Sequence, residues 1–293
     1  MPRGLDHLVL AAADLEAQAT VYRRLGFQVG KRNRHDWGTL NHIVQFDGCF
    51  LELLGTEPGF TRPDDAEPVA GFAGFLADYL ARREGLAMVV LESRDAAADQ
   101  AEFEGHGIAG PTTFHFARTG FRPDASPVRV AFTLAFARTP AIRDAGFFVC
   151  CQHAPESFWN KAQQVHPNGV TGIDAVVMAA ADPYAHAAFF EAFTGGGEVR
   201  RREGGLAVVT PRGAIEVVTP ERVRQTFGPD ATVAEPGAGP RFVAVRLACP
   251  DPDALAVRLA GEQVPHTAAA GSVVVPASAA FGVALTFAPS PPR

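Results

Sequence analysis

The feature that most constrains the fold is a unit that recurs four times along the 293-residue chain. Each copy has an apolar strand-like run, an Asp suited to cap a helix, a short helix, and a Gly where the helix ends. The first copy places these marks at Gly4, Asp14 and Gly26, and the later copies begin near residues 85, 172 and 241. Four copies of one pattern predict four copies of one supersecondary unit.

Shorter runs rich in β-branched and aromatic residues follow each helix, bounded by Gly and Pro, as in NHIVQFDG and CFLELLGT. Each unit is therefore predicted to be β-α-β-β-β, in an α+β fold whose antiparallel sheets carry helices on one face and are concave on the other. The expected modules span residues 4–56, 85–153, 172–219 and 241–289. They pair into two domains, 1–160 and 170–293, joined by a polar, turn-rich segment.

Composition and charge narrow the range of partners. The net charge is −6 and no basic patch offsets it, which disfavours a nucleic-acid partner. The cysteines show no C-x-x-C spacing, so neither a disulfide framework nor a zinc ribbon is predicted. No stretch resembles a signal peptide or is apolar enough to span a membrane. We expect a cytoplasmic protein whose partner is a small-molecule ligand, with no nucleic acid and no membrane; a homodimer is compatible with this interpretation.

His7 is the first candidate functional residue, because it interrupts an otherwise apolar strand. The run GLDHLVLAAAD at residues 4–14 recurs as GIDAVVMAAAD at 172–182 with seven of eleven positions identical, but Ala175 replaces His7. Strand alternation predicts that Leu5, His7 and Val9 share the concave face, opposite the face covered by the helix. A strand needed only for packing can carry Ala at that position.

Glu52 is the second candidate, because it lies between Leu51 and Leu53 in a strand predicted to be buried. An ionised carboxylate buried without a partner costs several kcal/mol, so Glu52 is expected to face a metal, a cation or a strong donor. Imidazole nitrogen and carboxylate oxygen suit Zn²⁺, Ni²⁺, Fe²⁺ or Mn²⁺. The alternative is a buried His7–Glu52 pair that holds no metal.

Several segments together resemble the vicinal oxygen chelate superfamily, which includes glyoxalase I, extradiol dioxygenases and bleomycin-resistance proteins. They are GLDHLVL with its following helix, WGTLNHIVQFDGCFLELLG at 37–55, FFVCCQHAPESFW at 147–159 and HPNGV at 166–170. Within that superfamily the chain is most similar to the glyoxalase-like domain family. The resemblance implies two glyoxalase-like domains. It also implies metal ligands on the first and last strands of a module, positions that His7 and Glu52 match.

The chain departs from the ligand pattern of its relatives. Glyoxalase I takes two ligands from each module of a pair, but Met88 stands at the second-module position of His7 and Cys150 at that of Glu52. Gln152 shares the strand face of Cys150 and can supply an oxygen. The expected ligand set is therefore His7, Glu52 and Gln152, and the four-ligand set is not intact. An extradiol dioxygenase needs a second histidine that we do not find.

The second pair of modules is expected to carry a degenerate site. Ala175 and Ala244 occupy the two histidine positions, and Leu285 occupies one glutamate position, although Glu216 matches Glu52. We expect this half to be non-catalytic. In the first half, residues near strand ends or in family-like segments are candidate substrate contacts, with a purely structural role as the alternative: Thr39, Asn41, His42, Arg138, Cys150, His153 and Trp159.

Two functions remain open from sequence. The first is a divalent-metal-dependent isomerase or lyase acting on a small α-hydroxy carbonyl-like substrate, with Glu52 moving the proton. The alternative is a metal-free protein that binds or sequesters a small molecule, as bleomycin-resistance proteins do. A scaffold role for the second half is a third, weaker hypothesis.

Overall fold

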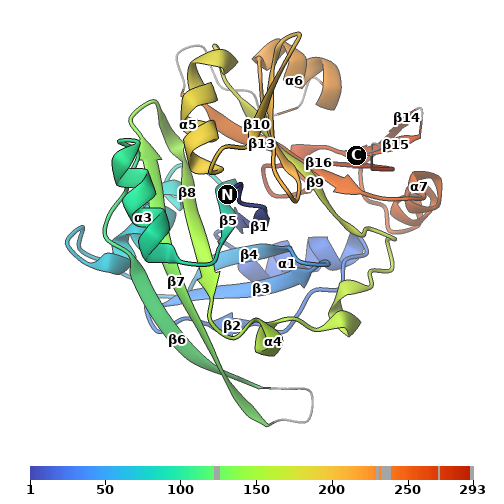
Figure 1. Cartoon of the computed structure of the whole chain (residues 1–293). Helices are drawn as coiled ribbons and strands as arrows, with labels where there is room; N and C mark the ends of the chain where they lie inside the picture. Colours follow the sequence, from blue (N-terminus) through green and yellow to red (C-terminus); the bar gives the residue numbers. More distant parts are fainter. Residues whose placement is uncertain (122–125, 229–230, 232–238, 270, 291–293) are drawn as a thin grey trace.

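The computed structural model describes residues 1–121, 126–228, 231, 239–269 and 271–290, and its two eight-stranded sheets divide the chain between them (Figure 1). The first sheet has the strand order β2-β3-β4-β1-β5-β8-β7-β6. Its strands are β1 (Leu5–Ala11), β2 (Asn33–Arg34), β3 (Thr39–Gln45), β4 (Phe50–Thr56), β5 (Gly85–Ser93), β6 (Phe114–Phe121), β7 (Pro127–Thr139) and β8 (Ile142–Gln152).

The second sheet repeats this order as β10-β11-β12-β9-β13-β16-β15-β14. Its strands are β9 (Gly172–Ala179), β10 (Glu198–Arg202), β11 (Gly205–Val209), β12 (Ala214–Val218), β13 (Arg241–Ala248), β14 (Thr267–Ala269), β15 (Ser272–Val275) and β16 (Ala284–Ala288). The α+β fold with four βαβββ modules is confirmed. The first and last strands of each module pair in parallel, as β1 does with β4, so both sheets are mixed rather than purely antiparallel.

The helices begin where the sequence predicts. The four module helices are α1 (Leu15–Arg24), α3 (Ala96–Gly105), the η3 (Pro183–His186) and α5 (Ala187–Phe193) pair, and α7 (Pro252–Gly261). In each copy an aspartate side chain accepts hydrogen bonds from the first-turn backbone amides, as expected of an N-cap: Asp14, Asp95, Asp182 and Asp251. None of the described helices is long and apolar enough to cross a membrane.

A bulge at Asp6 changes the predicted alternation along β1. Leu5 pairs with Leu91 of β5 and His7 pairs with the next residue, Val90, so Asp6 is an extra residue on β1. A bulge resets which face each side chain takes. Leu5 consequently belongs to the large core between the halves, and our prediction that it shares a face with His7 is wrong. The same bulge places the Asp6 side chain next to His7.

Two helices that we did not predict fill the concave faces of the sheets. In the first half, η1 (Pro68–Gly71) and α2 (Ala73–Leu80) follow β4, and Leu76 packs in one apolar cluster with Met88 and Phe148. In the second half, α6 (Pro220–Phe227) follows β12 and contributes Val223 and Phe227 to the concave cluster. Short turns α4 (Pro155–Phe158), η2 (Lys161–Gln164) and η4 (Ala277–Ala279) complete the described elements.

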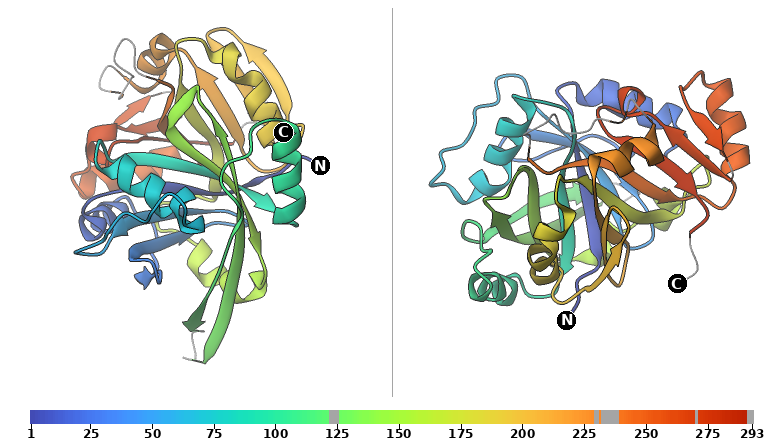
Figure 2. Two further views of the ribbon diagram at one scale, coloured as in Figure 1. Left: turned by 90° about the vertical axis from the view of Figure 1, so that its left-hand side faces the viewer. Right: turned by 90° about the horizontal axis from the view of Figure 1, so that it is seen from above.

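The two halves share one hydrophobic core, because α5 and β13 lie against β8 and β5 (Figures 1 and 2). Phe147 of β8 is the clearest contact: its ring meets Phe189, Phe190, Phe193 and Phe242 of the second half at centroid distances of 4.9 to 5.8 Å. The β6–β7 hairpin extends away from this core, beyond the rest of the first half (Figure 2). The halves are therefore expected to unfold together.

Replacing Phe147 with alanine tests this shared core. Phe147 is 3% exposed, so Phe147→Ala removes a buried ring and is expected to lower the free energy of unfolding by about 3–5 kcal/mol. Urea denaturation followed by fluorescence and by circular dichroism should show one shifted transition. Val257→Ala, at a residue that is 76% exposed, is the control and should change stability by less than about 0.5 kcal/mol. Two separate transitions, with only one displaced, would contradict a shared core.

Candidate functional site

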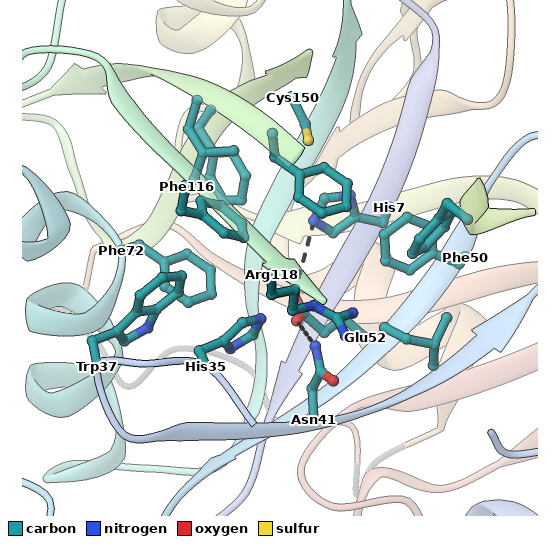
Figure 3. Close-up of a pocket in the computed structure, with 15 residues that line it drawn as sticks. His7, His35, Trp37, Asn41, Phe50, Glu52, Phe72, Phe116, Arg118 and Cys150 are labelled. Carbon is teal, nitrogen blue, oxygen red and sulfur yellow. Dashed lines mark hydrogen bonds and ion pairs between the residues drawn. The ribbon is translucent and has the colours of Figure 1, made fainter. Parts of the chain in front are cut away.

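A pocket lies on the concave face of the first sheet, between the strands, the start of α2 and the end of α4 (Figure 3). The space open to the centre of a water-sized sphere is about 50 Å³. Seven aromatic side chains form most of its wall: Trp37, Phe50, Phe72, Phe116, Phe132, Phe148 and Phe158. Its polar or titratable side chains are fewer: His7, His35, Asn41, Glu52, Arg118 and Cys150.

The His7 imidazole is held in one orientation. Its Nδ1 lies 2.5 Å from a carboxylate oxygen of Asp6, and the other Asp6 oxygen accepts a 2.8 Å hydrogen bond from the Gln152 side-chain amide. The imidazole also stacks on Phe50, with ring centroids 4.3 Å apart. These contacts leave Nε2 facing Glu52, whose nearer oxygen is 3.9 Å away (Figure 3).

Glu52 is buried, as its sequence context predicts, at 5% exposure. Ile43 of β3 lies opposite Glu52 of β4, and Asn41 is two residues before Ile43, so the Asn41 and Glu52 side chains face the same side of the sheet, toward the pocket. The Asn41 amide donates a 2.5 Å hydrogen bond to Glu52. Burial raises the pKa of the Glu52 carboxyl above its ordinary value, and this effect exceeds the opposing influence of His7 and Asn41. The Glu52 carboxyl therefore holds its proton to a higher pH than an exposed glutamate does.

His35 and Arg118 line the pocket but were not among our predicted site residues. His35 Nδ1 is 2.7 Å from the Thr39 hydroxyl, and its ring stacks on Trp37 at 4.6 Å. Burial and the positive charge of Arg118 lower the pKa of His35 to about 3, so it is uncharged at neutral pH. Thr39, which we predicted as a substrate contact, thus orients His35 and does not itself line the pocket.

Arg118 extends into the pocket from β6, the outer strand of the sheet (Figure 3). A weak signal for it exists in the sequence: Phe114, Phe116 and Arg118 alternate, and alternation places all three on one face. Without knowing which face of β6 meets the pocket, that alternation does not identify Arg118. Burial lowers the pKa of its guanidinium, and the nearby Glu52 opposes this shift.

Besides Thr39 and Trp159, three more predicted substrate contacts lie outside the pocket. His42 follows Asn41 and therefore faces the opposite side of β3, where Nδ1 bonds the Gly30 carbonyl. Arg138 donates to the Ala109 carbonyl instead of facing a ligand. His153 is exposed and lies 2.7 Å from the Thr133 hydroxyl.

Of the remaining predicted site residues, two line the pocket and two do not. Asn41 and Cys150 line the pocket, and burial raises the pKa of the Cys150 thiol well above its usual range, so it stays protonated. Trp159 lies behind the wall, with its ring 5.0 Å from that of Phe158. Gln152, the expected third metal ligand, does not line the pocket, because its amide is bonded to Asp6.

The residues present do not fit a resident divalent cation. Catalytic metal sites usually offer three protein ligands and an open position. Within the described ranges, no group of three or more His, Cys, Asp or Glu side chains is placed to hold a metal. Of the second-module positions, Met88 packs in the cluster beneath α2, and Cys150 is a neutral thiol. The guanidinium of Arg118 already supplies a positive charge near Glu52.

The second half shows what replaces this site when the histidine is lost. Arg246 lies opposite Ala175 in the β9–β13 ladder, and its Nε donates a 2.9 Å hydrogen bond to Glu216. Its guanidinium also lies over the Phe227 ring of α6, 5.2 Å from the centroid. Glu216, which matches Glu52, is thus paired within the protein.

Comparison with solved structures identifies the class of fold. A hypothetical protein from Staphylococcus aureus superposes with a TM-score of 0.68 at 10% identity, covering 98% of this chain and 99% of that one. A variant of 4-hydroxymandelate synthase from Streptomyces coelicolor gives 0.56 at 10% identity, with 98% and 92% covered. The Mn(II)-bound glyoxalase from Novosphingobium aromaticivorans gives 0.52 at 12% identity, with 98% and 82% covered. These structures share the fold of the vicinal oxygen chelate superfamily.

The sequence itself assigns the family. Residues 5–194 match the model of the glyoxalase-like domain, and the chain belongs to that family. A search of curated proteins finds no match. The family match spans the whole first sheet and ends within the first module of the second.

The pH dependence of stability tests the environment of Glu52. Because its pKa is raised on folding, the unfolded chain loses the Glu52 proton first, and the parent loses stability as pH rises from about 4.5 to the folded-state pKa. Glu52→Gln has no proton to lose there. Its free energy of unfolding relative to the parent should therefore increase with pH, by at most about 1.4 kcal/mol per pH unit.

Urea denaturation of both proteins from pH 4.5 to pH 8 measures this difference. Glu216→Gln removes the corresponding carboxylate of the second half and controls for the substitution itself. A stability difference between Glu52→Gln and the parent that stays constant across this range would contradict the assigned environment.

Proposed function

We propose that the pocket of the first half is the active site of an isomerase or lyase. The enzyme moves a proton on a small oxygen-bearing molecule, with His7 as the base. The observation that carries this proposal is the geometry of His7: Asp6 holds Nδ1 at 2.5 Å, and Nε2 faces the pocket and Glu52. An imidazole oriented by a carboxylate is a common general base.

In the proposed reaction, Nε2 of His7 removes a proton from a carbon next to a carbonyl group. The C–H bonding pair becomes the enolate, and the proton-bearing form of Glu52 supplies a proton to the enolate oxygen. In an isomerisation of an α-hydroxy carbonyl compound, the former carbonyl carbon takes the proton held by His7, and ionised Glu52 removes the hydroxyl proton from the other carbon, which becomes the new carbonyl. In a lyase reaction, the enol electrons instead expel a leaving group from the carbon on the other side of the deprotonated carbon; the leaving group takes the proton from His7 and the enol proton returns to Glu52. The apolar wall excludes water and strengthens these interactions.

The proposal assigns no step to a metal, because the donor set does not fit one. This differs from our sequence-based hypothesis of a metal-dependent enzyme. The metal-free binding function is the second candidate, and the seven aromatic wall residues favour it, since they suit sequestration of an apolar molecule. Both candidates place a small molecule in the same pocket, and only the first requires His7 to transfer a proton.

Deuterium exchange separates the two candidates. The protein is incubated in D₂O with hydroxyacetone or glycolaldehyde and excess EDTA, and loss of the C–H signal next to the carbonyl is followed by proton NMR. We expect exchange above the buffer rate, lowered at least about 100-fold in His7→Gln. His153→Gln, which changes an exposed histidine outside the pocket, is the matched control and should exchange like the parent.

Exchange that is equal in the parent and in His7→Gln would overturn the assignment of His7 as base. Bound probe with no exchange in any variant would favour the binding function instead.

A further inference from the structure

The Arg118 side chain enters the pocket but forms no ion pair with a described carboxylate. Its guanidinium lies among the lining residues, yet within the described part of the chain it forms no salt bridge with a carboxylate. Its one hydrogen bond there is a long one, 3.4 Å from Nη1 to the Asn33 side-chain oxygen, and its buried Nε has no partner. An arginine in this setting loses hydrogen bonds to water, and the protein supplies too few acceptors to replace them.

Two other arginines that enter the protein interior are paired with carboxylates. Arg3, which is 5% exposed, is bonded to Asp99 and Glu102 at 2.6 and 2.5 Å. Arg246 of the second half is bonded to Glu216 at 2.9 Å. In the first half the matching Glu52 is instead held by Asn41, so Arg118 is not neutralised by it.

We infer that Arg118 is the receptor for a carboxylate group, and that the ligand of this pocket is a small carboxylic acid. This inference rests on the proposed function and names its substrate class. A carboxylate accepts two parallel hydrogen bonds from a guanidinium, which is the pairing that Arg118 lacks. The nearby Glu52 carboxyl is bonded to Asn41 and forms no ion pair with Arg118 among the described residues, so the guanidinium has free donors for a ligand carboxylate.

The cavity limits the size of this acid. A buried water occupies about 10–15 Å³ on the scale of sphere centres, so about 50 Å³ holds about four water-sized groups. An engineered apolar cavity of about 150 Å³ binds benzene, and the space here is smaller than that. The part of the ligand that this space encloses is therefore about four non-hydrogen atoms: a carboxylate on Arg118 and a short chain against the aromatic wall.

Ligand-observed NMR with the whole protein tests the inference. Acetate, glycolate and pyruvate are titrated as charged probes, and acetamide and glycolamide as neutral isosteres. We expect acetate and glycolate to bind at least ten-fold more tightly than acetamide and glycolamide, and pyruvate to bind as a third carboxylate. Arg118→Met should remove this preference, while Arg138→Met, which changes an arginine bonded outside the pocket, should retain it.

Equal binding of acetate and acetamide, or an unchanged preference in Arg118→Met, would overturn the inference. That failure is distinguishable from failure of the proposed function. If hydroxyacetone still exchanges deuterium in a His7-dependent way, the pocket performs proton transfer on neutral molecules and only the carboxylate assignment is lost. A folded Arg118→Met variant is confirmed by its circular dichroism and by an unchanged single unfolding transition.

Discussion

The contact between Asp6 and His7 is the interaction on which the site depends. Neighbouring residues on a regular strand point to opposite faces, so an adjacent Asp and His do not normally meet. The bulge at Asp6 removes that restriction and lets a carboxylate oxygen reach Nδ1 of the next residue. Phe50 then fixes the plane of the ring. One extra residue in β1 therefore positions the base, and the rest of the pocket is arranged around its free nitrogen.

The two halves keep the same bulge but use it differently. In the β9–β13 ladder Leu247 pairs with Ile173 and Arg246 with Ala175, so the intervening Asp174 is the extra residue, as Asp6 is in β1. With Ala175 in place of histidine, Arg246 reaches Glu216, and α6 fills the concave face. In the first half α2 also packs on the concave face, and a pocket stays open beside it at His7 and Glu52. The comparison indicates that the His7 position separates an open site from a filled one.

Much of the fold could be predicted because the helices and strands of each module are marked by signals in their own local sequence. These local signals are the capping aspartates, the glycines after the helices and the β-rich runs. Because the same signals recur in four modules, each copy supports the interpretation of the other three. His7 and Glu52 stood out for the same reason, as polar residues in apolar strands. The helices α2 and α6 escaped prediction because they lie between modules, outside the repeat. Localisation and oligomeric state stay predictions.

The site residues that sequence missed depend on long-range placement. Whether Arg118 or Arg138 enters the pocket is decided by which face of β6 and β7 turns inward, and no local signal fixes that choice. Gln152 is a different case: alternation predicts it near the site, but its side-chain amide donates a 2.8 Å hydrogen bond to Asp6 and it is not among the residues that line the pocket. A one-residue irregularity thus explains why Leu5 differs from expectation and why Asp6 bonds both His7 and Gln152.

The tautomer of His7 is the most direct test of this account. Two-bond ¹H–¹⁵N correlation spectra of protein labelled at histidine, recorded at pH 8.5, report which ring nitrogen carries the hydrogen. The His7 signals are those absent from His7→Gln. The account predicts a protonated Nδ1, donated to Asp6, and an unprotonated Nε2 open to the pocket. A hydrogen on Nε2 with a bare Nδ1 would contradict it, because His7 would then have no lone pair to offer a ligand.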